Sequence, residues 1–261
     1  MKCLARRIVD RHVLHLIKMW LNAPIEEDGG KGNRSRSNPG RRTKRGTPQG
    51  APISPLLSNL YMRRFILGWK KLCAVRRWRA YIVNYADDFV ICCKDQAREA
   101  MVAMRQMMER LKLTVNEDKT HLCQLPQERF DYLGYTIGRC YSRKTGKAYL
   151  GTRPAKKSVQ RMVESIRQET ERQKAWLDAE QVVRRLNQKL DGWANYFCLG
   201  SVSPAYRAID QYTTQRLRRW LCKKHKVTGR GKTSFPDQYL REELGLITLS
   251  VRTRNLPWAK A

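Results

Sequence analysis

The chain has 261 residues, of which 41% are hydrophobic, and it carries a formal net charge of +30. This length allows one large domain or two modest ones, and the hydrophobic content excludes a wholly disordered chain. No apolar run approaches the roughly 18 residues that a membrane-spanning helix needs, and the N-terminus lacks the apolar region of a secretory signal. The positive excess predicts a polyanionic partner, and the aromatic residues favour nucleic acid over a membrane surface.

The first 45 residues change from a helical pattern to a basic loop. Apolar residues recur at helical spacing over residues 1–22, which predicts a helix. Glycine and proline then interrupt residues 26–45 and argue against a regular element there. Residues 31–45 include seven basic residues and no acidic one, so they form either a solvated loop or a phosphate-binding surface. The candidates for phosphate contact are Arg41, Arg42, Lys44 and Arg45.

The basic run leads into a tight loop that is followed by a helix. The loop contains Pro48, Gln49 and Gly50. Ser54 followed by Pro55 is a typical helix start, and apolar residues then recur at helical spacing. A loop of this kind brings backbone N–H groups close to a ligand, and Gln49 can both donate and accept hydrogen bonds.

Two adjacent carboxylates, Asp87 and Asp88, lie between two short apolar runs within residues 82–93. The runs are rich in β-branched residues and predict two strands, and the break at Ala86, Asp87 and Asp88 predicts a tight hairpin between them. The carboxylates would then lie at the tip of a rigid strand pair. Because burying them without compensation is costly, a pair of divalent metal ions is the predicted ligand.

Three further elements are predicted before a boundary. Residues 100–111 carry apolar side chains, mostly methionine, on one face of a helix. Residues 113–120 predict a strand that runs into a polar turn, and residues 130–138 predict a short hairpin. Residues 139–157 are polar and basic and predict a linker between two domains.

Three amphipathic helical patterns follow this linker and predict an antiparallel three-helix unit. The second pattern begins near Asp178 and is stopped by Gly200. Ser203 and Pro204 open the third pattern, as expected for a helix start.

The third of these helices and the residues after it are strongly basic. Residues 205–232 include nine lysine and arginine residues and one acidic residue, Asp210. This composition predicts a stripe that binds a nucleic-acid backbone. The candidate residues are Arg216, Arg218, Arg219, Lys223, Lys224 and Lys226. The aromatic residues of these helices are predicted to pack in the core rather than to stack on bases.

The eight cysteines show neither C-x-x-C spacing nor a histidine at zinc-ligand spacing, so a zinc site is not predicted. Several of them lie inside apolar runs, as small core residues do. The pattern suits a reducing compartment, and we expect a cytoplasmic protein.

Four blocks in the chain resemble, in their order, group II intron-encoded reverse transcriptases, or maturases. The blocks are residues 46–61, 84–89, 113–120 and 130–135, and residues 155–250 resemble the maturase, or X, domain that serves as the thumb. The resemblance covers essentially the whole chain. It implies an α+β fold, in which a partial reverse-transcriptase palm of antiparallel strands and helices precedes an all-α three-helix thumb or maturase domain. The implied domains are fingers and palm at 1–138, a linker at 139–157, the helical maturase domain at 158–250 and a tail at 251–261.

The resemblance also implies roles for matching residues. Asp87 and Asp88 would be two of the family's three catalytic aspartates and would ligate Mg²⁺. Lys119 would assist the departing pyrophosphate, although a lysine in this turn is equally compatible with a surface position. The residues near the primer, template or incoming nucleotide would be Pro48, Gln49, Gly50, Tyr85, Ala86 and Asn116.

The activity that the resemblance implies is RNA-directed DNA synthesis, combined with intron RNA binding in splicing and retrohoming. The implied partners are intron RNA, an RNA template, a DNA primer and dNTPs. The implied location is the bacterial cytoplasm, with no membrane partner, and a homodimer is left open.

One residue expected from the resemblance has no match. The family's third block carries another metal-binding aspartate on a palm strand, and residues 1–45 do not supply it. Asp10 lies in a helical stretch and Asp28 lies in a glycine-rich loop. The chain is therefore interpreted as N-terminally truncated. This departure keeps two alternatives open, which are a non-catalytic RNA-binding maturase fragment and an inactive gene remnant.

Overall fold

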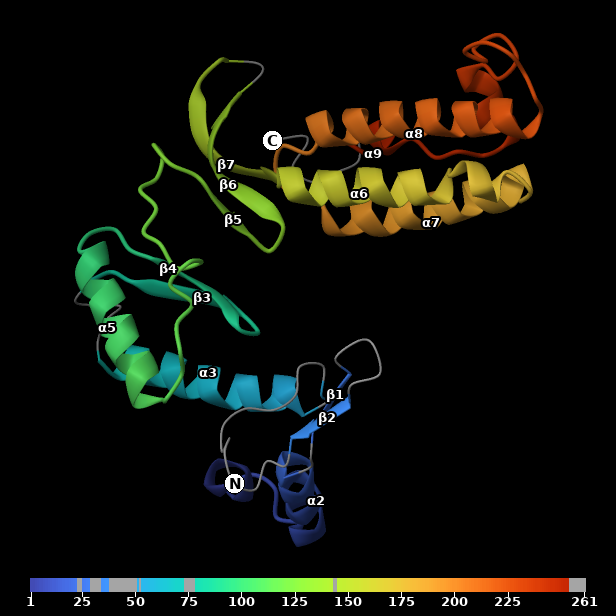
Figure 1. The fold of residues 1–261 in the computed structure, drawn as a ribbon. Coiled ribbons are helices and arrows are strands. Elements are labelled where there is room, and N and C mark those ends of the chain that lie inside the picture. The colour runs from blue at the N-terminus through green and yellow to red at the C-terminus, as the bar shows by residue number, and fades with distance from the viewer. Residues whose placement is uncertain are drawn as a thin grey trace. The chain divides into compact units, whose positions relative to one another are not determined.

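The computed structural model describes residues 1–22, 25–28, 34–37, 51, 53–72, 78–142 and 145–253. The chain divides into two compact units, Met1–Leu122 and Cys123–Ala261, and each unit has its own hydrophobic core. Figure 1 shows helices and small antiparallel sheets in both units, which confirms the predicted α+β class. No helix among the described residues is both long enough and apolar enough to cross a membrane.

The N-terminal part of the first unit contains two helices and a hairpin, which are α1 (Lys2–Ala5), α2 (Arg11–Asn22), β1 (Ile25–Asp28) and β2 (Arg34–Ser37). The helix predicted over residues 1–22 is thus interrupted. Asp10 explains the second start, because its Oδ1 accepts hydrogen bonds from the backbone N–H groups of His12 (2.7 Å) and Val13 (3.3 Å). The sequence predicted no regular element over residues 26–45, and this was wrong where β1 pairs with β2. Asp28, which was expected in a loop, is the last residue of β1.

The rest of the first unit is built from four elements, which are α3 (Ser54–Lys71), β3 (Tyr81–Tyr85), β4 (Asp88–Cys92) and α5 (Ala97–Arg110). Helix α3 begins at Ser54, as predicted, with Pro55 in its first turn. Proline is tolerated there because the N–H groups of the first turn have no hydrogen-bond partner within the helix. Phe65 and Trp69 of α3 are buried in one cluster with the methionine face of α5. The Trp69 indole also donates to the carbonyl of Ala80 (3.0 Å), which ties the approach to β3 to this core.

Residues 113–120 do not form the predicted strand. The backbone N–H of Leu113 donates to the carbonyl of Met108 (2.9 Å), so the chain folds back on the end of α5, and residues 117–119 form a turn. Leu113 and Val115 pack against the core of the unit. The alternating pattern of this segment therefore reflects burial against helices rather than pairing in a sheet.

The second unit begins with a three-stranded antiparallel sheet, whose strands in spatial order are β5 (Phe130–Tyr132), β6 (Tyr135–Tyr141) and β7 (Ala148–Pro154). The hairpin predicted over residues 130–138 is present, with Leu133 and Gly134 both at positive φ in its turn. The segment 139–157, predicted as a linker, instead holds the end of β6, all of β7 and the start of α6. Strand β5 pairs only with residues 135–137 of β6, so the rest of the β6–β7 hairpin, which we call the β6–β7 arm, is two-stranded and largely exposed. Exposed strands carry polar and basic side chains, and the composition of this segment therefore resembles that of a loop.

Three helices form the main body of the second unit, which are α6 (Lys156–Glu169), α7 (Ala179–Tyr196) and α8 (Ser203–Lys224). Figure 1 shows them side by side, and Ile166, Leu186 and Leu217 lie fully buried in the cluster between them. The predicted three-helix unit is confirmed, and α8 starts at the predicted Ser203 with Pro204 in its first turn.

The second unit also has three short helical elements, which are the 3₁₀ turn η1 (Arg172–Lys174), the π-helical turn η2 (Tyr239–Glu243) and α9 (Leu249–Arg252). Asp210 of α8 caps α9, because its carboxylate accepts hydrogen bonds from the backbone N–H groups of Leu249 (2.8 Å) and Ser250 (2.9 Å). Leu240 and Leu249 are fully buried against the three long helices. The segment that carries η2 and α9 is therefore part of the helical core.

The sheet and the helices of the second unit are joined by hydrogen bonds and by one glycine. The hydroxyl of Tyr135 donates to the carbonyl of Tyr196 at the end of α7 (2.5 Å), and burial raises the pKa of this phenol, which keeps it a neutral donor. The backbone N–H of Ser201 donates to the carbonyl of Thr152 in β7 (2.8 Å). Gly200, at φ +73°, permits this close approach of the α7–α8 loop to β7.

Replacing Gly200 by alanine is expected to lower the thermal unfolding midpoint. A Cβ atom there would collide with the carbonyl and hydroxyl of Thr152, and a positive φ costs a residue with a side chain about 1–2 kcal/mol. Gly192→Ala is the matched control, because a Cβ at Gly192 meets nothing within 4 Å and alanine favours a helix by up to about 1 kcal/mol. Differential scanning calorimetry should give an unchanged or higher midpoint for Gly192→Ala. An unchanged midpoint for Gly200→Ala would contradict the contact with β7.

Candidate active site and nucleic-acid interface

The predicted carboxylate pair lies at the tip of the β3–β4 hairpin. Tyr85 and Asp88 form the last residue pair, so Ala86 and Asp87 make the two-residue turn and Asp88 is the first residue of β4. Ala86 has a φ of +52°, which a residue with a Cβ atom adopts only when its surroundings hold it there. This tight turn keeps the two adjacent carboxylates at one exposed end of a strand pair.

The two faces of this hairpin have different surroundings. Ile82, Phe89 and Ile91 belong to one face and pack on the core between α3 and α5. Because side chains alternate along a strand, Tyr85 and Asp88 belong to the opposite face. The side chains of both residues are exposed. Packing of the inner face therefore directs the Asp88 carboxylate away from the core.

The donor atoms of Asp87 and Asp88 fit a magnesium ion. Mg²⁺ prefers hard oxygen ligands and usually takes one or two protein carboxylates, with water and phosphate oxygens completing its shell. In the part of the chain that the structure describes, no group of three or more His, Cys, Asp and Glu side chains is arranged to hold a metal ion. Two adjacent aspartates offer the one or two carboxylates that Mg²⁺ usually takes from a protein.

Asn116 and Lys119 lie on the turn that follows α5. The side-chain Oδ1 and the backbone carbonyl of Asn116 each accept a hydrogen bond from the backbone N–H of Lys119 at 3.2 Å. Arg105 of α5 donates to the carboxylate of Glu117 (2.5 Å) and holds the turn on the helix. The side chains of Asn116 and Lys119 are exposed, in the same compact unit as the carboxylate pair.

The predicted residues of the basic segment and of the tight loop lie outside the described residues. They are Arg41, Arg42, Lys44, Arg45, Pro48, Gln49 and Gly50. Their roles stay predictions, whereas the helix that the loop precedes, α3, begins where the sequence predicts it.

Arg218, predicted to contact RNA, is instead used inside the helical unit. Its side chain is 9% exposed, and its Nε donates to the carbonyl of Phe235 (2.9 Å). Its guanidinium also forms an ion pair with Asp237. These contacts hold the segment after α8 against the helix, so Arg218 has a structural function in this unit.

Two other predicted cations of α8 bind the loop between α6 and α7. Arg216 donates to the carbonyl of Thr170 at the end of α6 (2.9 Å), and the ammonium of Lys224 donates to the carbonyl of Leu177 (2.8 Å). A cation suits the position at Thr170, because the last carbonyl groups of a helix lack partners within the helix, whereas Leu177 lies just before the start of α7. The predicted cations of this segment whose side chains are exposed are Arg219, Lys223 and Lys226.

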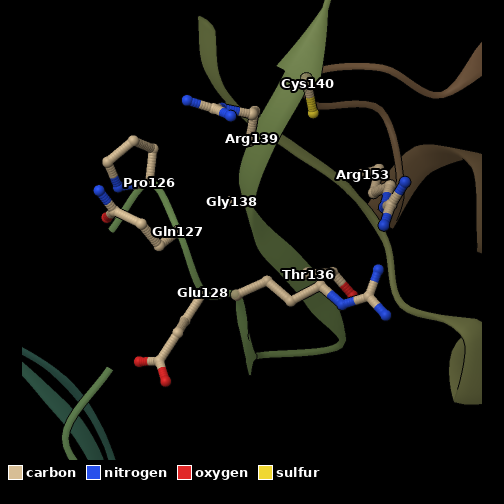
Figure 2. A pocket seen from close by; sticks show the side chains of 9 residues that line it. Pro126, Gln127, Glu128, Thr136, Gly138, Arg139, Cys140 and Arg153 are labelled. Carbon is tan, nitrogen blue, oxygen red and sulfur yellow. The ribbon is translucent and has the colours of Figure 1, made fainter. Parts of the chain in front are cut away.

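A hollow over the β5–β7 sheet was not anticipated from the sequence. Figure 2 shows it, with a volume of about 340 Å³ and a lining of Pro126, Gln127, Glu128, Arg129, Thr136, Gly138, Arg139, Cys140 and Arg153. Three arginines and one glutamate give this lining a positive excess that suits a phosphate group. Thr136 and Arg153 meet here because they pair across β6 and β7. The sequence did not predict this pair, because residues 139–157 were interpreted as a linker and strand β7, which carries Arg153, was not expected.

Comparisons with known proteins connect these features to a family. Residues 1–137, more than half of the chain, match the family described as reverse transcriptase (RNA-dependent DNA polymerase), and they include the β3–β4 hairpin. Residues 159–235 match the group II intron, maturase-specific domain, and they include α7, α8 and most of α6. A search of curated proteins found no match. The chain therefore belongs to the group II intron reverse transcriptase/maturase family, whose function is in the splicing of group II introns.

Proposed function

We propose that this chain catalyses RNA-directed DNA synthesis, in which dNTPs are added to a primer 3′-OH at a Mg²⁺ site formed by Asp87 and Asp88. The observation that supports this proposal is the two-residue turn that holds both carboxylates at an exposed hairpin tip, within the residues that match reverse transcriptases. When bound, Mg²⁺ would stabilise the negative charge that develops on the reacting phosphate. The residues of the chain bind and orient the substrates, because phosphoryl transfer of this type depends mainly on positioning and charge.

The residues around the carboxylates would position the two substrates. Tyr85 lies directly across from Asp88 on the exposed face, so its ring and the backbone of Ala86 can contact the primer end. Lys119 would supply a proton or a positive charge to the departing pyrophosphate. The remaining contacts to template or incoming nucleotide would come from Pro48, Gln49, Gly50 and Asn116.

We also propose that the second unit binds intron RNA and the template–primer duplex through exposed cations. Arg219 and Lys223 are one turn apart and share one side of α8, and Lys226 is an exposed residue just after the C-cap of that helix, His225. Phosphate groups along this side would relieve the repulsion that a net charge of +30 creates. Arg41, Arg42, Lys44 and Arg45 would add further phosphate contacts. A location in the bacterial cytoplasm and a homodimer stay predictions from the sequence.

Asp87→Asn is expected to reduce primer extension on an RNA template by about 10²-fold or more, because it removes a charged ligand and misplaces the reacting groups. Asp95→Asn is the matched control, since Asp95 is an exposed aspartate that follows β4 rather than standing at the hairpin tip. Gel-based primer extension with equal amounts of each protein measures the effect. Equal activity of Asp87→Asn and Asp95→Asn would refute the proposed metal site.

Replacing Arg219, Lys223 and Lys226 together by alanine is expected to weaken the salt dependence of RNA binding. Each lost phosphate contact should reduce the slope of log affinity against log salt concentration by about 0.7–0.9. Fluorescence anisotropy over a salt series measures this slope, and the unfolding midpoint should stay unchanged because these side chains are exposed.

Arg218→Ala provides the contrast to this triple variant. It should lower the unfolding midpoint, since the loss of buried hydrogen bonds costs about 1–3 kcal/mol. A salt slope that is the same in the triple variant and the wild type would show that RNA binds elsewhere.

A further inference from the structure

The loop between α6 and α7 presents a tryptophan to solvent. Trp176 is 77% exposed, whereas the next residue, Leu177, is 6% exposed and belongs to the core of the helical unit. A single exposed apolar side chain is common in proteins and by itself indicates no ligand. Trp176 differs from such a residue in how its loop is held and in the charged residues on that loop and on α7.

Two cations of α8 hold this loop, one near each of its ends, so the backbone around Trp176 is fixed. Lys224 of α8 donates to the carbonyls of Leu177 (2.8 Å) and Ala175 (3.4 Å), the two neighbours of Trp176. At the other end of the loop, Arg216 donates to the carbonyl of Thr170 (2.9 Å). The 3₁₀ turn η1 orders the residues between them. A ligand that binds Trp176 would thus lose little free energy in ordering the loop.

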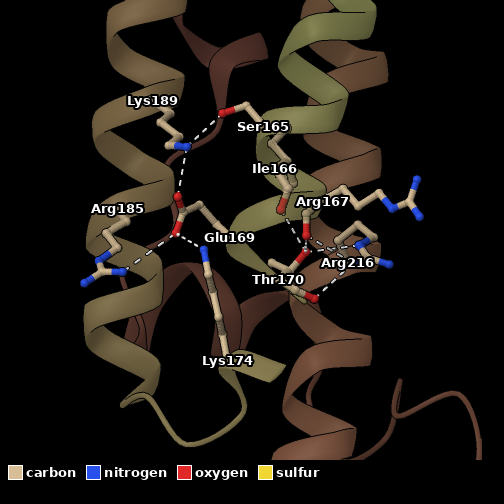
Figure 3. Close-up of polar contacts among 9 residues, drawn as sticks. All are labelled: Ser165, Ile166, Arg167, Glu169, Thr170, Lys174, Arg185, Lys189 and Arg216. Atoms are coloured by element: carbon tan, nitrogen blue, oxygen red, sulfur yellow. Dashed lines mark hydrogen bonds and ion pairs between the residues drawn. The ribbon is translucent and has the colours of Figure 1, made fainter. Parts of the chain in front are cut away.

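Beside this loop, one buried carboxylate is shared by three cations. The side chain of Glu169 is 12% exposed, and its oxygens lie 2.9 Å from Lys189 Nζ, 3.3 Å from Lys174 Nζ and 4.0 Å from an Arg185 guanidinium nitrogen. Figure 3 shows the three side chains converging on Glu169 from α7 and from the loop. Lys189 also donates to the hydroxyl of Ser165 (2.9 Å). We name Lys174, Arg185 and Lys189 the Glu169 cluster.

The Glu169 cluster retains a positive excess. Burial acts to raise the pKa of the Glu169 carboxyl, but the hydrogen bonds and charges of Lys189 and Lys174 outweigh it and lower the pKa, so the carboxylate carries its full charge at neutral pH. Among the described residues, no other carboxylate oxygen lies within 4.0 Å of these three cations. Three positive charges therefore lie within 4.0 Å of one negative charge, and the side chains of Lys174 and Arg185 are 32% and 51% exposed.

Trp176 and Lys174 are near one another along the chain, and Asp178, which is exposed, follows the indole by two residues. Trp176 follows Lys174 by two residues, so their Cα atoms lie within about 7 Å of each other. A flat apolar surface beside an excess of positive charge is complementary to a nucleotide, which joins a planar base to a phosphate. In a duplex the faces of the bases are covered by their neighbours, whereas unpaired nucleotides can stack on an aromatic side chain.

We infer that Trp176 and the Glu169 cluster form a binding site for unpaired nucleotides of RNA, with a base stacked on the indole and the adjoining phosphates on Lys174 and Arg185. Glu169 acts as a positioning residue that holds the cations in place. The inference rests on the proposed function in one respect, which is that the polyanionic partner is RNA. It adds to that function a preference for single-stranded segments, at a place distinct from the carboxylate hairpin.

The test measures binding of the full chain to a fluorescently labelled RNA oligonucleotide without secondary structure, and to the same oligonucleotide paired with its complement. Trp176→Ala should weaken binding to the unpaired RNA by about tenfold and leave binding to the duplex unchanged. Trp176→Phe should bind the unpaired RNA more tightly than Trp176→Ala, since a phenyl ring still stacks. Trp20→Ala is the matched control, because Trp20 is a 55% exposed tryptophan of the first unit, and this variant should bind as the wild type does.

The salt dependence of RNA affinity separates the contribution of base stacking from that of phosphate contacts. The Trp176→Ala variant should keep the salt slope of the wild type, while the double variant Lys174→Ala/Arg185→Ala should reduce the slope by about 1.4. Unchanged affinity of Trp176→Ala for unpaired RNA would overturn the inference and would assign the exposed indole to another kind of partner. Equal weakening of duplex and unpaired binding would also overturn it.

Failure of this inference can be distinguished from failure of the proposed function. A chain that extends primers, and whose Trp176→Ala variant binds unpaired RNA normally, keeps the proposed function and loses this site. A chain without primer extension that shows the tenfold loss keeps this site as an RNA-binding surface.

Discussion

The imbalance between 53 cationic and 23 anionic side chains is the constraint on which the other features of this protein depend. Most cations cannot find a carboxylate within the fold, and the helical unit shows two ways in which some of them are accommodated. Arg216 and Lys224 donate to backbone carbonyls of the α6–α7 loop, and three cations share Glu169. The excess of like charge is mutually repulsive. A polyanion that binds the folded chain would relieve this repulsion and would thereby stabilise the folded state.

In the β3–β4 hairpin, packing of one face determines where the carboxylates on the other face lie. Ile82, Phe89 and Ile91 are drawn to the α3–α5 core, and the alternation of side chains along the strands then forces Asp88 to the other face. The two-residue turn adds Asp87 beside it, at the price of a positive φ at Ala86. A register shift of one residue would reverse the two faces, so the core also protects the orientation of the carboxylates.

The successes and failures of prediction follow from the range of the interactions involved. The starts of α3, α7 and α8 were predicted correctly from local patterns, which are a proline in the first turn of α3 and of α8 and Asp178 at the N-cap position of α7. Residues 113–120 were wrongly predicted as a strand, because alternate burial against helices gives the same pattern as a half-buried strand. The β6–β7 arm was missed because a two-stranded extension with exposed faces has the composition of a loop.

By itself, the sequence determined the family, the adjacent aspartates, the positive excess and the three amphipathic helices. These features depend on short motifs and on periodicity, which act locally and can be recognised without knowledge of contacts. The tertiary structure alone decided which cations of α8 face solvent, that Glu169 holds one cation of the α6–α7 loop and two of α7, and that Trp176 is exposed. Each of these depends on residues that are distant in the chain, such as Arg218 with Asp237 and Glu169 with Lys189, and such contacts arise only when the helices pack.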